Sequence, residues 1–183
     1  MRCFIGIPLN SNIKNKIQKV QGALTRTGAN IKMVEEENLH MTVKFLGDVN
    51  DPQINDIDNV KNILNKYHPF EIEIGSMGAF PSLDYIRVIW VGVTKGHKRI
   101  KKLIENVNTQ LEKMGFQKEK NKITPHITIG RMKSGKNKND VKNIIKKHNK
   151  TTFGNLNIDE LLLYQSKLSR SGPMYKIIKK YEI

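Results

Sequence analysis

The chain has 183 residues and a mass of 21.0 kDa, which is the size of one domain or of two closely fused lobes. Hydrophobic residues make up 38% of it, too many for a disordered chain, and no apolar run approaches the ~20 residues that span a bilayer. The N-terminal stretch lacks the apolar segment of a signal peptide, so we expect a cytoplasmic protein with no membrane partner. Cys3 is the only cysteine, which excludes a disulfide framework and a cysteine-based zinc site.

Basic residues dominate the charge. Lys and Arg total 32 against 17 Asp and Glu, for a net charge of +15 and a pI near 9.9. Such an excess favours a polyanionic partner. Only six of these residues are arginine, so dense bidentate recognition of phosphate is not widespread. A lysine-rich composition also arises from a biased genome or a hot habitat without any role in nucleic-acid binding, and charge alone leaves both interpretations open.

Hydrophobic periodicity divides the chain into alternating strands and helices. The pattern of the first half predicts, in order, a strand at residues 3–7, a helix at 13–24, a strand at 39–46, a helix at 54–67 and a strand at 70–74. The second half predicts a strand at 87–93, a helix at 100–114, an extended segment at 123–131, a helix around 141–145, and strands at 158–167 and 174–183 joined by a turn. No linker separates independent domains, so we expect a single domain over residues 1–183.

Two parts of the chain repeat the same order of elements. A strand that begins at Arg2 precedes His40 by 38 residues, and one that begins at Arg87 precedes His126 by 39. Both units run strand, helix, strand, and both end in a His-x-Thr-x motif, at residues 40–43 and 126–129. We interpret the units, at about 2–49 and 87–132, as a duplication that gives a two-lobed fold with approximate two-fold symmetry.

The two motifs indicate chemistry because side chains at i and i+2 share one face of a strand. His40 and Thr42 then project together, as do His126 and Thr128, while the residues between them enter the core. A two-fold arrangement brings two imidazoles and two hydroxyls to one cleft. One neutral imidazole can remove a proton from an attacking oxygen while the other, as imidazolium, protonates the leaving oxygen of a phosphate. The hydroxyls can donate to phosphoryl oxygens.

Arg131 is a further candidate for phosphate contact. It falls on the side opposite His126 in a regular strand, so a bulge or strand end at Gly130 is needed to turn it toward the phosphate. A zinc site is the competing interpretation of the histidines, but the motifs offer no acidic or cysteine third ligand, and we expect no metal. A single His-x-Thr is usually only a half-buried strand, and it is the paired occurrence that favours catalysis.

The paired motifs resemble those of the 2H phosphoesterase superfamily, and within it the RNA 2′,3′-cyclic phosphodiesterases, also called 2′-5′ RNA ligases. The resemblance covers essentially the whole chain and extends to Phe80-Pro81-Ser82, to residues 87–93, and to Ser166-Lys167-Leu168 with Gly172-Pro173-Met174-Tyr175.

The resemblance implies an α+β fold in which antiparallel sheets flank a central cleft, and an activity that needs no cofactor. It also implies that His40 protonates the ribose 3′ oxygen, that His126 activates water, and that Thr42, Thr128 and Arg131 contact the phosphate. The partner is then RNA with a 2′,3′-cyclic phosphate end, and the product carries a 2′-phosphate. Reversal with an RNA 5′-hydroxyl makes a 2′-5′ linkage, so ligation is an expected side activity of a protein that we expect to be a monomer.

Alternatives with the same fold are a phosphodiesterase acting on a small cyclic nucleotide and a non-catalytic module that binds RNA or nucleotides. Phe80, Trp90 and Tyr175 are candidates to stack on a terminal base, although such aromatic residues are usually core. The lysine-rich loop at residues 133–138 either guides an RNA backbone or is simply solvated.

Overall fold

The structure is a computed structural model, and it describes residues 1–169 and 172–183. Residues 170 and 171, in the predicted turn between the last two strands, lie outside the described residues. In chain order the elements are β1 (Arg2–Pro8), α1 (Ser11–Arg26), β2 (Ile31–Met33), η1 (Glu36–Asn38), β3 (His40–Asp48), α2 (Asp51–Ile57), η2 (Asp58–Val60), α3 (Lys61–Leu64), β4 (Phe70–Pro81), β5 (Ile86–Lys95), α4 (His97–Lys113), β6 (Ile127–Met132), α5 (Lys138–Lys147), β7 (Thr152–Ile158), β8 (Glu160–Ser169) and β9 (Gly172–Glu182). Here η denotes a 3₁₀ turn.

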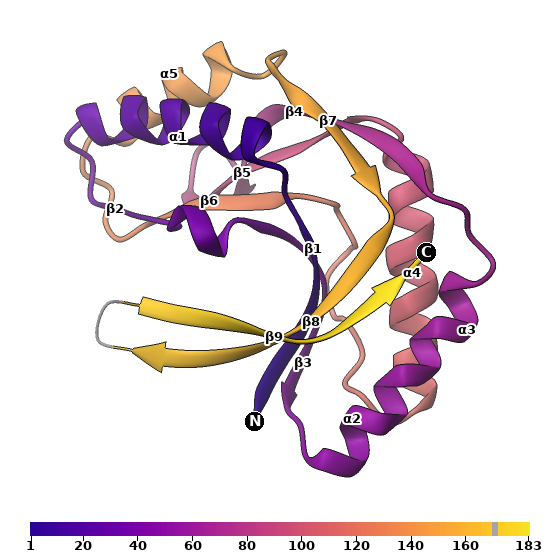
Figure 1. The fold of residues 1–183 in the computed structure, drawn as a ribbon. Coiled ribbons are helices and arrows are strands. Elements are labelled where there is room, and N and C mark those ends of the chain that lie inside the picture. Colours follow the sequence, from indigo (N-terminus) through magenta and orange to yellow (C-terminus); the bar gives the residue numbers. More distant parts are fainter. Residues whose placement is uncertain (170–171) are drawn as a thin grey trace.

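The strands of the described residues form one curled antiparallel sheet (Figure 1). Its order is β7-β4-β5-β6-β3-β1-β8-β9, with the short β2 paired to β6. The two halves meet where β3 and β6 pair through a single residue on each side, Met41 opposite Ile127. On either side of this junction the strands follow equivalent order, β3-β1-β8-β9 and β6-β5-β4-β7. The predicted two-lobed α+β fold is therefore confirmed, and its two lobes are the halves of one continuous sheet, joined where β3 pairs with β6.

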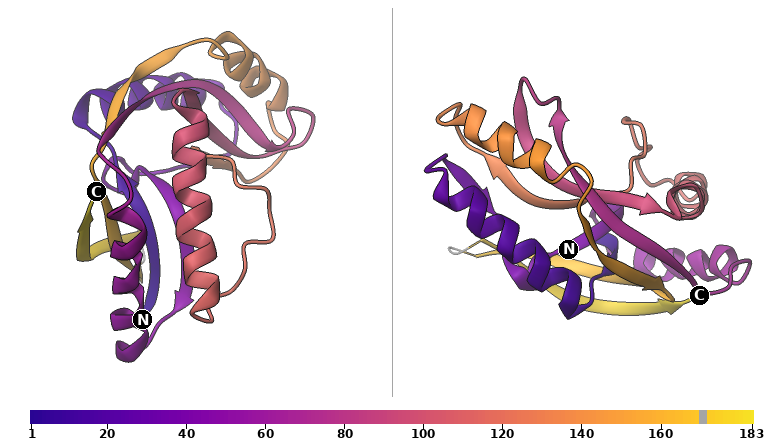
Figure 2. Two further views of the ribbon diagram at one scale, coloured as in Figure 1. Left: turned by 90° about the vertical axis from the view of Figure 1, so that its right-hand side faces the viewer. Right: turned by 90° about the horizontal axis from the view of Figure 1, so that it is seen from above.

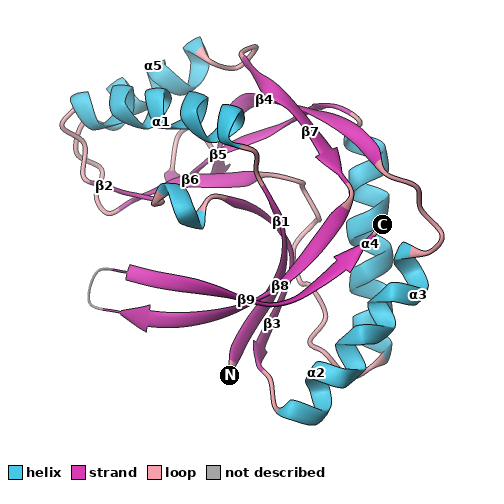
Figure 3. Cartoon of the chain, viewed as in Figure 1, coloured by secondary structure: helices cyan, strands magenta, loops and turns pink. Residues whose placement is uncertain are grey.

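Each helix of the duplicated units packs on the sheet half of the other unit. Helix α1 follows β1 but contacts β7 and β6, and α4 follows β5 but contacts β3. Figure 2 shows α1 and α5 over one half of the sheet and α4 with α3 over the other, and Figure 3 shows the strands between these two groups. The predicted apolar stripe of α1, from Ile13 to Leu24, is buried. Because the helices cross over, the core of each half uses residues from both units.

The structure adds the short β2 to the predicted elements, extends β4 from residue 74 to Pro81, and begins β6 only at Ile127. Two further differences have a local cause. Residues 54–67, predicted as one helix, form the end of α2, then η2 and α3, and the helical part ends at Leu64. Ile57 at the end of α2 and Val60 at the end of η2 are both buried and are spaced by three, which suits the three-residue turn of a 3₁₀ helix. Strand β7 is absent from the sequence prediction, because Gly154, at φ 140°, interrupts the alternation of buried and exposed residues.

Candidate active site

The two His-x-Thr motifs meet at the junction between the sheet halves. Met41 and Ile127 face each other there and are fully buried, so their neighbours in each strand project to the opposite face. This antiparallel register sets His40 across from Thr128 and Thr42 across from His126. All four motif side chains are half-buried. The structure thus brings together the histidines and threonines that the sequence singled out, although the motifs are 86 residues apart.

Both imidazoles are fixed in the same way by the backbone that precedes them. Nδ1 of His40 lies 2.7 Å from the carbonyl oxygen of Asn38, and Nδ1 of His126 lies 2.6 Å from that of Thr124. A carbonyl oxygen only accepts, so Nδ1 carries a proton in each ring and Nε2 is the nitrogen available for proton transfer. The Asn38 side chain in turn donates to the carbonyl oxygen of Pro173 at 2.8 Å, which holds this part of the chain against β9.

His40 is enclosed on several sides. Its Nε2 is 3.0 Å from Oγ1 of Thr42, and its ring centroid lies 4.7 Å from that of Phe4 and 5.4 Å from that of Tyr175. Gly6 of β1 leaves space for the ring, since a Cβ atom there would lie 3.1 Å from Cδ2 of His40. This histidine is therefore held by packing as well as by hydrogen bonds.

His126 has aromatic neighbours from its own half of the sheet. Phe80 contacts it edge-to-face at 5.0 Å between ring centroids, and Trp90 lies at 6.4 Å. Phe80 and Tyr175 thus occupy comparable places beside the two histidines, where each packs against an imidazole. Stacking of a base on Phe80, Trp90 or Tyr175 stays a prediction.

Burial governs the protonation of both histidines. It lowers the pKa of His40, with the Asn38 carbonyl opposing this effect and the nearby His126 adding to it. Burial likewise lowers the pKa of His126, where the Thr124 carbonyl opposes and the Arg131 guanidinium adds to the shift. Both imidazoles therefore favour the neutral form more than an exposed histidine does.

Thr42, His126 and Arg131 line a cavity of about 920 Å³. The cationic residues that line it are Lys44, Arg87, Lys122, Arg131 and Lys133. His40 and Thr128 are not among the lining residues, and His40 is next to the cavity through its hydrogen bond to Thr42. A cavity of this size lies within the usual range for small-molecule and cofactor sites.

A β-bulge in β6 accounts for the position of Arg131. On β5, Ile89 and Trp90 are consecutive, but their partners on β6 are Gly130 and Thr128, so Ile129 is the extra residue. The carbonyl oxygen of Ile129 instead accepts from Nε2 of Gln21 at 2.9 Å and from the backbone of Val34. The bulge that the sequence analysis required for turning Arg131 is therefore present, at Ile129, one residue before Gly130. The sequence analysis did not predict that buried Gln21 supports this bulge.

Sequence reasoning also missed Lys44 and Asn108, which line the same cavity and are 2% and 3% exposed. Buried lysines are rare and are paired where they occur, but a single lysine in a strand gives no signal of burial.

Within the described part of the chain, no three His, Cys, Asp or Glu side chains gather closely enough to hold a metal ion. None of the helices described combines the length and apolarity needed to cross a membrane.

Comparisons with known proteins identify relatives along the whole chain. The family model described as the AKAP7 2′5′ RNA ligase-like domain matches residues 2–183. A Methanocaldococcus jannaschii protein named RNA 2′,3′-cyclic phosphodiesterase is 38% identical over 181 residues, which cover 99% of this chain and 100% of the relative. A Methanothermobacter thermautotrophicus protein of the same name is 33% identical, covering 100% of this chain and 99% of the relative.

Solved structures share the fold. A Thermus thermophilus protein superposes with a TM-score of 0.82 at 21% identity, covering 100% of this chain and 97% of that one. Escherichia coli LigT complexed with 3′-AMP gives a TM-score of 0.79 at 20% identity, with the same coverage. The fold and the paired motifs define a 2H phosphoesterase. Within that class, the chain belongs to the 2′5′ RNA ligase-like family.

Proposed function

We propose that this protein hydrolyses the 2′,3′-cyclic phosphate end of RNA to a 2′-phosphate end without a metal ion, with one histidine as general base and the other as general acid. The observation that carries the proposal is the matched pair of imidazoles, each of which donates its Nδ1 proton to a backbone carbonyl, so that Nε2 is the nitrogen that can exchange a proton with substrate. Nε2 of His40 lies 3.0 Å from Oγ1 of Thr42, one of the hydroxyls proposed to contact the phosphate. The names of the relatives support the substrate class. The net charge of +15 suits capture of a polyanion.

In the proposed reaction, Nε2 of neutral His126 accepts a proton from water as the water oxygen bonds to phosphorus. The bond between phosphorus and the ribose 3′ oxygen breaks, and protonated His40 gives its Nε2 proton to that oxygen. The products are a 2′-phosphate and a free 3′-hydroxyl. Arg131 supports the choice of His126 as base, because its cation adds to the effects that keep this imidazole neutral.

The phosphate is held by hydroxyl and guanidinium groups in this scheme. Thr42 and Thr128 lie across the junction from the histidines, and each hydroxyl can donate to a phosphoryl oxygen. Arg131 lines the cavity with His126, where a guanidinium can bind two oxygens at once. Ligation is the same reaction in reverse, with an RNA 5′-hydroxyl in the place of water and a 2′-5′ linkage as product.

The test uses an oligoribonucleotide with a 2′,3′-cyclic phosphate end and excess chelator. We expect conversion to the 2′-phosphate, and a 3′-phosphate product would contradict the proposed leaving group. His40→Ala and His126→Ala should each remove nearly all turnover, since proton transfer by a positioned side chain contributes roughly 10²–10⁴-fold. Near-normal turnover in either variant, or loss of activity on chelation, would refute the scheme.

The salt dependence of turnover distinguishes an RNA substrate from a small cyclic nucleotide. The cavity that His126 lines is also lined by Arg87 and Lys133, which favours a substrate with a further phosphate. Binding through several phosphates weakens as salt rises, because condensed counterions are released. We expect an oligonucleotide to show this salt dependence and a mononucleotide cyclic phosphate to show little. Equal turnover of both at all salt concentrations would instead favour the small substrate.

A further inference from the structure

The segment that orients His126 has little structure of its own. Residues 115–126 lie between α4 and β6 and form neither helix nor strand. In the described chain, the backbone of residues 117–125 makes no hydrogen bond to other backbone groups. Yet the carbonyl oxygen that fixes Nδ1 of His126 belongs to Thr124, near the end of this segment. Phe116 and Pro125 are buried and Ile123 packs on the core, and polar side-chain contacts add to this apolar hold.

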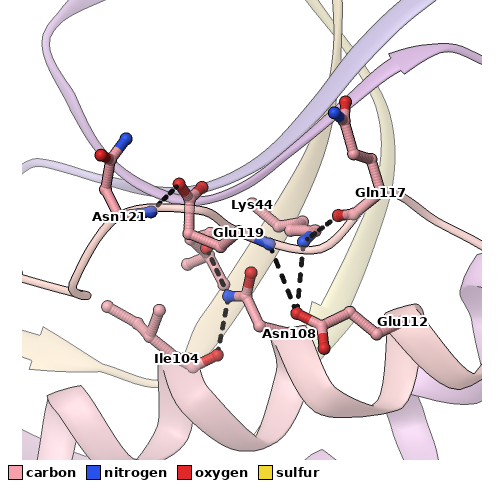
Figure 4. A network of polar contacts seen from close by, with 8 residues as sticks. Lys44, Ile104, Asn108, Glu112, Gln117, Glu119 and Asn121 are labelled. Carbon is pink, nitrogen blue, oxygen red and sulfur yellow. Dashed lines mark hydrogen bonds and ion pairs between the residues drawn. The ribbon is translucent and has the colours of Figure 1, made fainter.

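These polar contacts form a chain (Figure 4). Nζ of Lys44 donates to the carbonyl oxygen of Gln117 at 2.6 Å and lies 3.9 Å from Oε1 of Glu112. The same Glu112 oxygen accepts from the backbone N–H of Glu119 at 3.4 Å, and Oε1 of Glu119 accepts from that of Asn121 at 3.1 Å. The contacts run from β3 across the end of α4 to a point three residues before Thr124.

Lys44 reaches this position because of a bulge in β3. Ile5 and Gly6 are consecutive in β1, but they pair with Lys44 and Thr42, so Val43 is the extra residue. Regular alternation would have placed the side chains of Thr42 and Lys44 on one face of the strand. The bulge changes this relation. Lys44 still lines the cavity with Thr42, and its ammonium group contacts the Gln117 carbonyl of the 115–126 segment.

The burial of Lys44 is difficult to explain by stability alone. Its side chain is 1% exposed, and burial lowers its pKa, an effect that Glu112 and Glu119 oppose. Taking an ammonium and a carboxylate out of water is costly, and apolar residues of similar volume often stabilise a fold at least as well. A lysine does offer what an apolar residue cannot, which is a directed hydrogen bond to the Gln117 carbonyl.

We propose that Lys44 is a positioning residue: it fastens the 115–126 segment to β3 and, through Thr124, fixes the orientation and protonated nitrogen of His126. The consequence for turnover rests on the proposed function, whereas the effect on the His126 ring does not. His40 provides an internal reference, since its carbonyl partner Asn38 is held separately by Pro173.

The experiment compares Lys44→Met with the parent. Met keeps most of the apolar volume and removes the donor. Lys101→Met is the matched control, because Lys101 pairs with Glu105 on the surface of α4. Imidazole ¹⁵N and ¹H spectra recorded against pH report, for each histidine, the pKa and the exchange rate of the Nδ1 proton, without any need for turnover.

We expect Lys44→Met to lower the pKa of His126, because its Nδ1 proton loses the Thr124 carbonyl that opposes the effect of burial, and to speed exchange of that proton, with His40 unchanged. Turnover of the cyclic phosphate should fall roughly tenfold to a hundredfold, mainly in kcat, because the base is displaced while the phosphate contacts remain. Lys101→Met should change neither property. An unaltered His126 spectrum in Lys44→Met would overturn the proposal.

Glu112→Gln keeps the test decisive if Lys44→Met does not fold. This substitution preserves shape and an acceptor oxygen at a partly exposed side chain, and it removes the charge that Lys44 pairs with. A selective change at His126 in this variant supports the proposal, and unchanged spectra reject it. Absence of turnover in the parent would reject the proposed function, while the spectra still decide the role of Lys44.

Discussion

Gly6→Ala should damage the site by crowding a single ring. The added Cβ would lie 3.1 Å from Cδ2 of His40, 3.3 Å from the carbonyl oxygen of Met41 and 3.4 Å from Cε2 of Phe4. The backbone oxygen belongs to a paired strand and the Phe4 ring is buried, so His40 is the group that must move, by a few tenths of an ångström. Overpacking of this kind costs about 1–3 kcal/mol.

Each kcal/mol should lower Tm by about 2–4 °C in a chain of this size. Because small displacements of a catalytic group have large kinetic effects, we expect kcat to fall by roughly tenfold or more. Gly22→Ala is the control, because the added Cβ meets only Nη1 of Arg26, at 3.6 Å. Alanine in place of glycine within a helix should raise the free energy of unfolding by about 0.5–1 kcal/mol. Parent-like Tm and kcat in Gly6→Ala, measured by calorimetry and cyclic-phosphate turnover, would refute this reasoning.

Three further predictions concern charge and packing. The pKa values of His40 and His126 are lowered by folding, so the unfolded chain binds more protons than the folded chain. Their contribution to stability is therefore complete above about pH 6.5 and is lost as the pH falls through the folded-state pKa values. Urea titrations at several pH values should show the free energy of unfolding changing by up to ~1.4 kcal/mol per pH unit for each histidine, and substitution of that histidine by Asn should remove its part of the slope. Arg131→Met should raise the pKa of His126 and move the acid limb of the pH–rate profile to higher pH; an unmoved limb would argue against His126 as base. Met41→Ala, at the fully buried junction, should cost about 2–5 kcal/mol in the free energy of unfolding by urea, and a loss of less than ~1 kcal/mol would show that this packing does not hold the junction together.

The parts of the molecule that are predictable follow regular periodicity. The apolar stripes of α1 and α4 repeat every three or four residues, and the His-x-Thr motifs alternate with the buried Met41 and Ile127. Local pattern suffices in such places because the repeat of the side chains matches the repeat of the backbone. The matching offsets of the two units also predict, from residue spacing alone, that His40 and His126 occupy equivalent places.

The parts that are not predictable depend on bulges and on contacts between distant segments. The bulges lie near Gly154 in β7, at Ile129 before Arg131, and at Val43 before Lys44, and each reflects an extra residue in one strand relative to its partner. A bulge is defined by the pairing of two strands, so one strand's sequence does not reveal it. The crossing of α1 and α4 onto opposite halves likewise depends on tertiary packing.

The sequence by itself determined which residues form the candidate site, because two histidines and two threonines recur at matching offsets, a pattern that chance seldom produces. Tertiary structure decided how that site is held. It assigned the protonated nitrogen of each imidazole through the carbonyl oxygens of Asn38 and Thr124, and it brought Arg131 to the cavity. It also buried Lys44 against the segment that precedes His126. Residue types and their spacing suffice to indicate the class of chemistry. The protonation state and the orientation of each histidine depend on neighbouring groups that come together only when the chain folds.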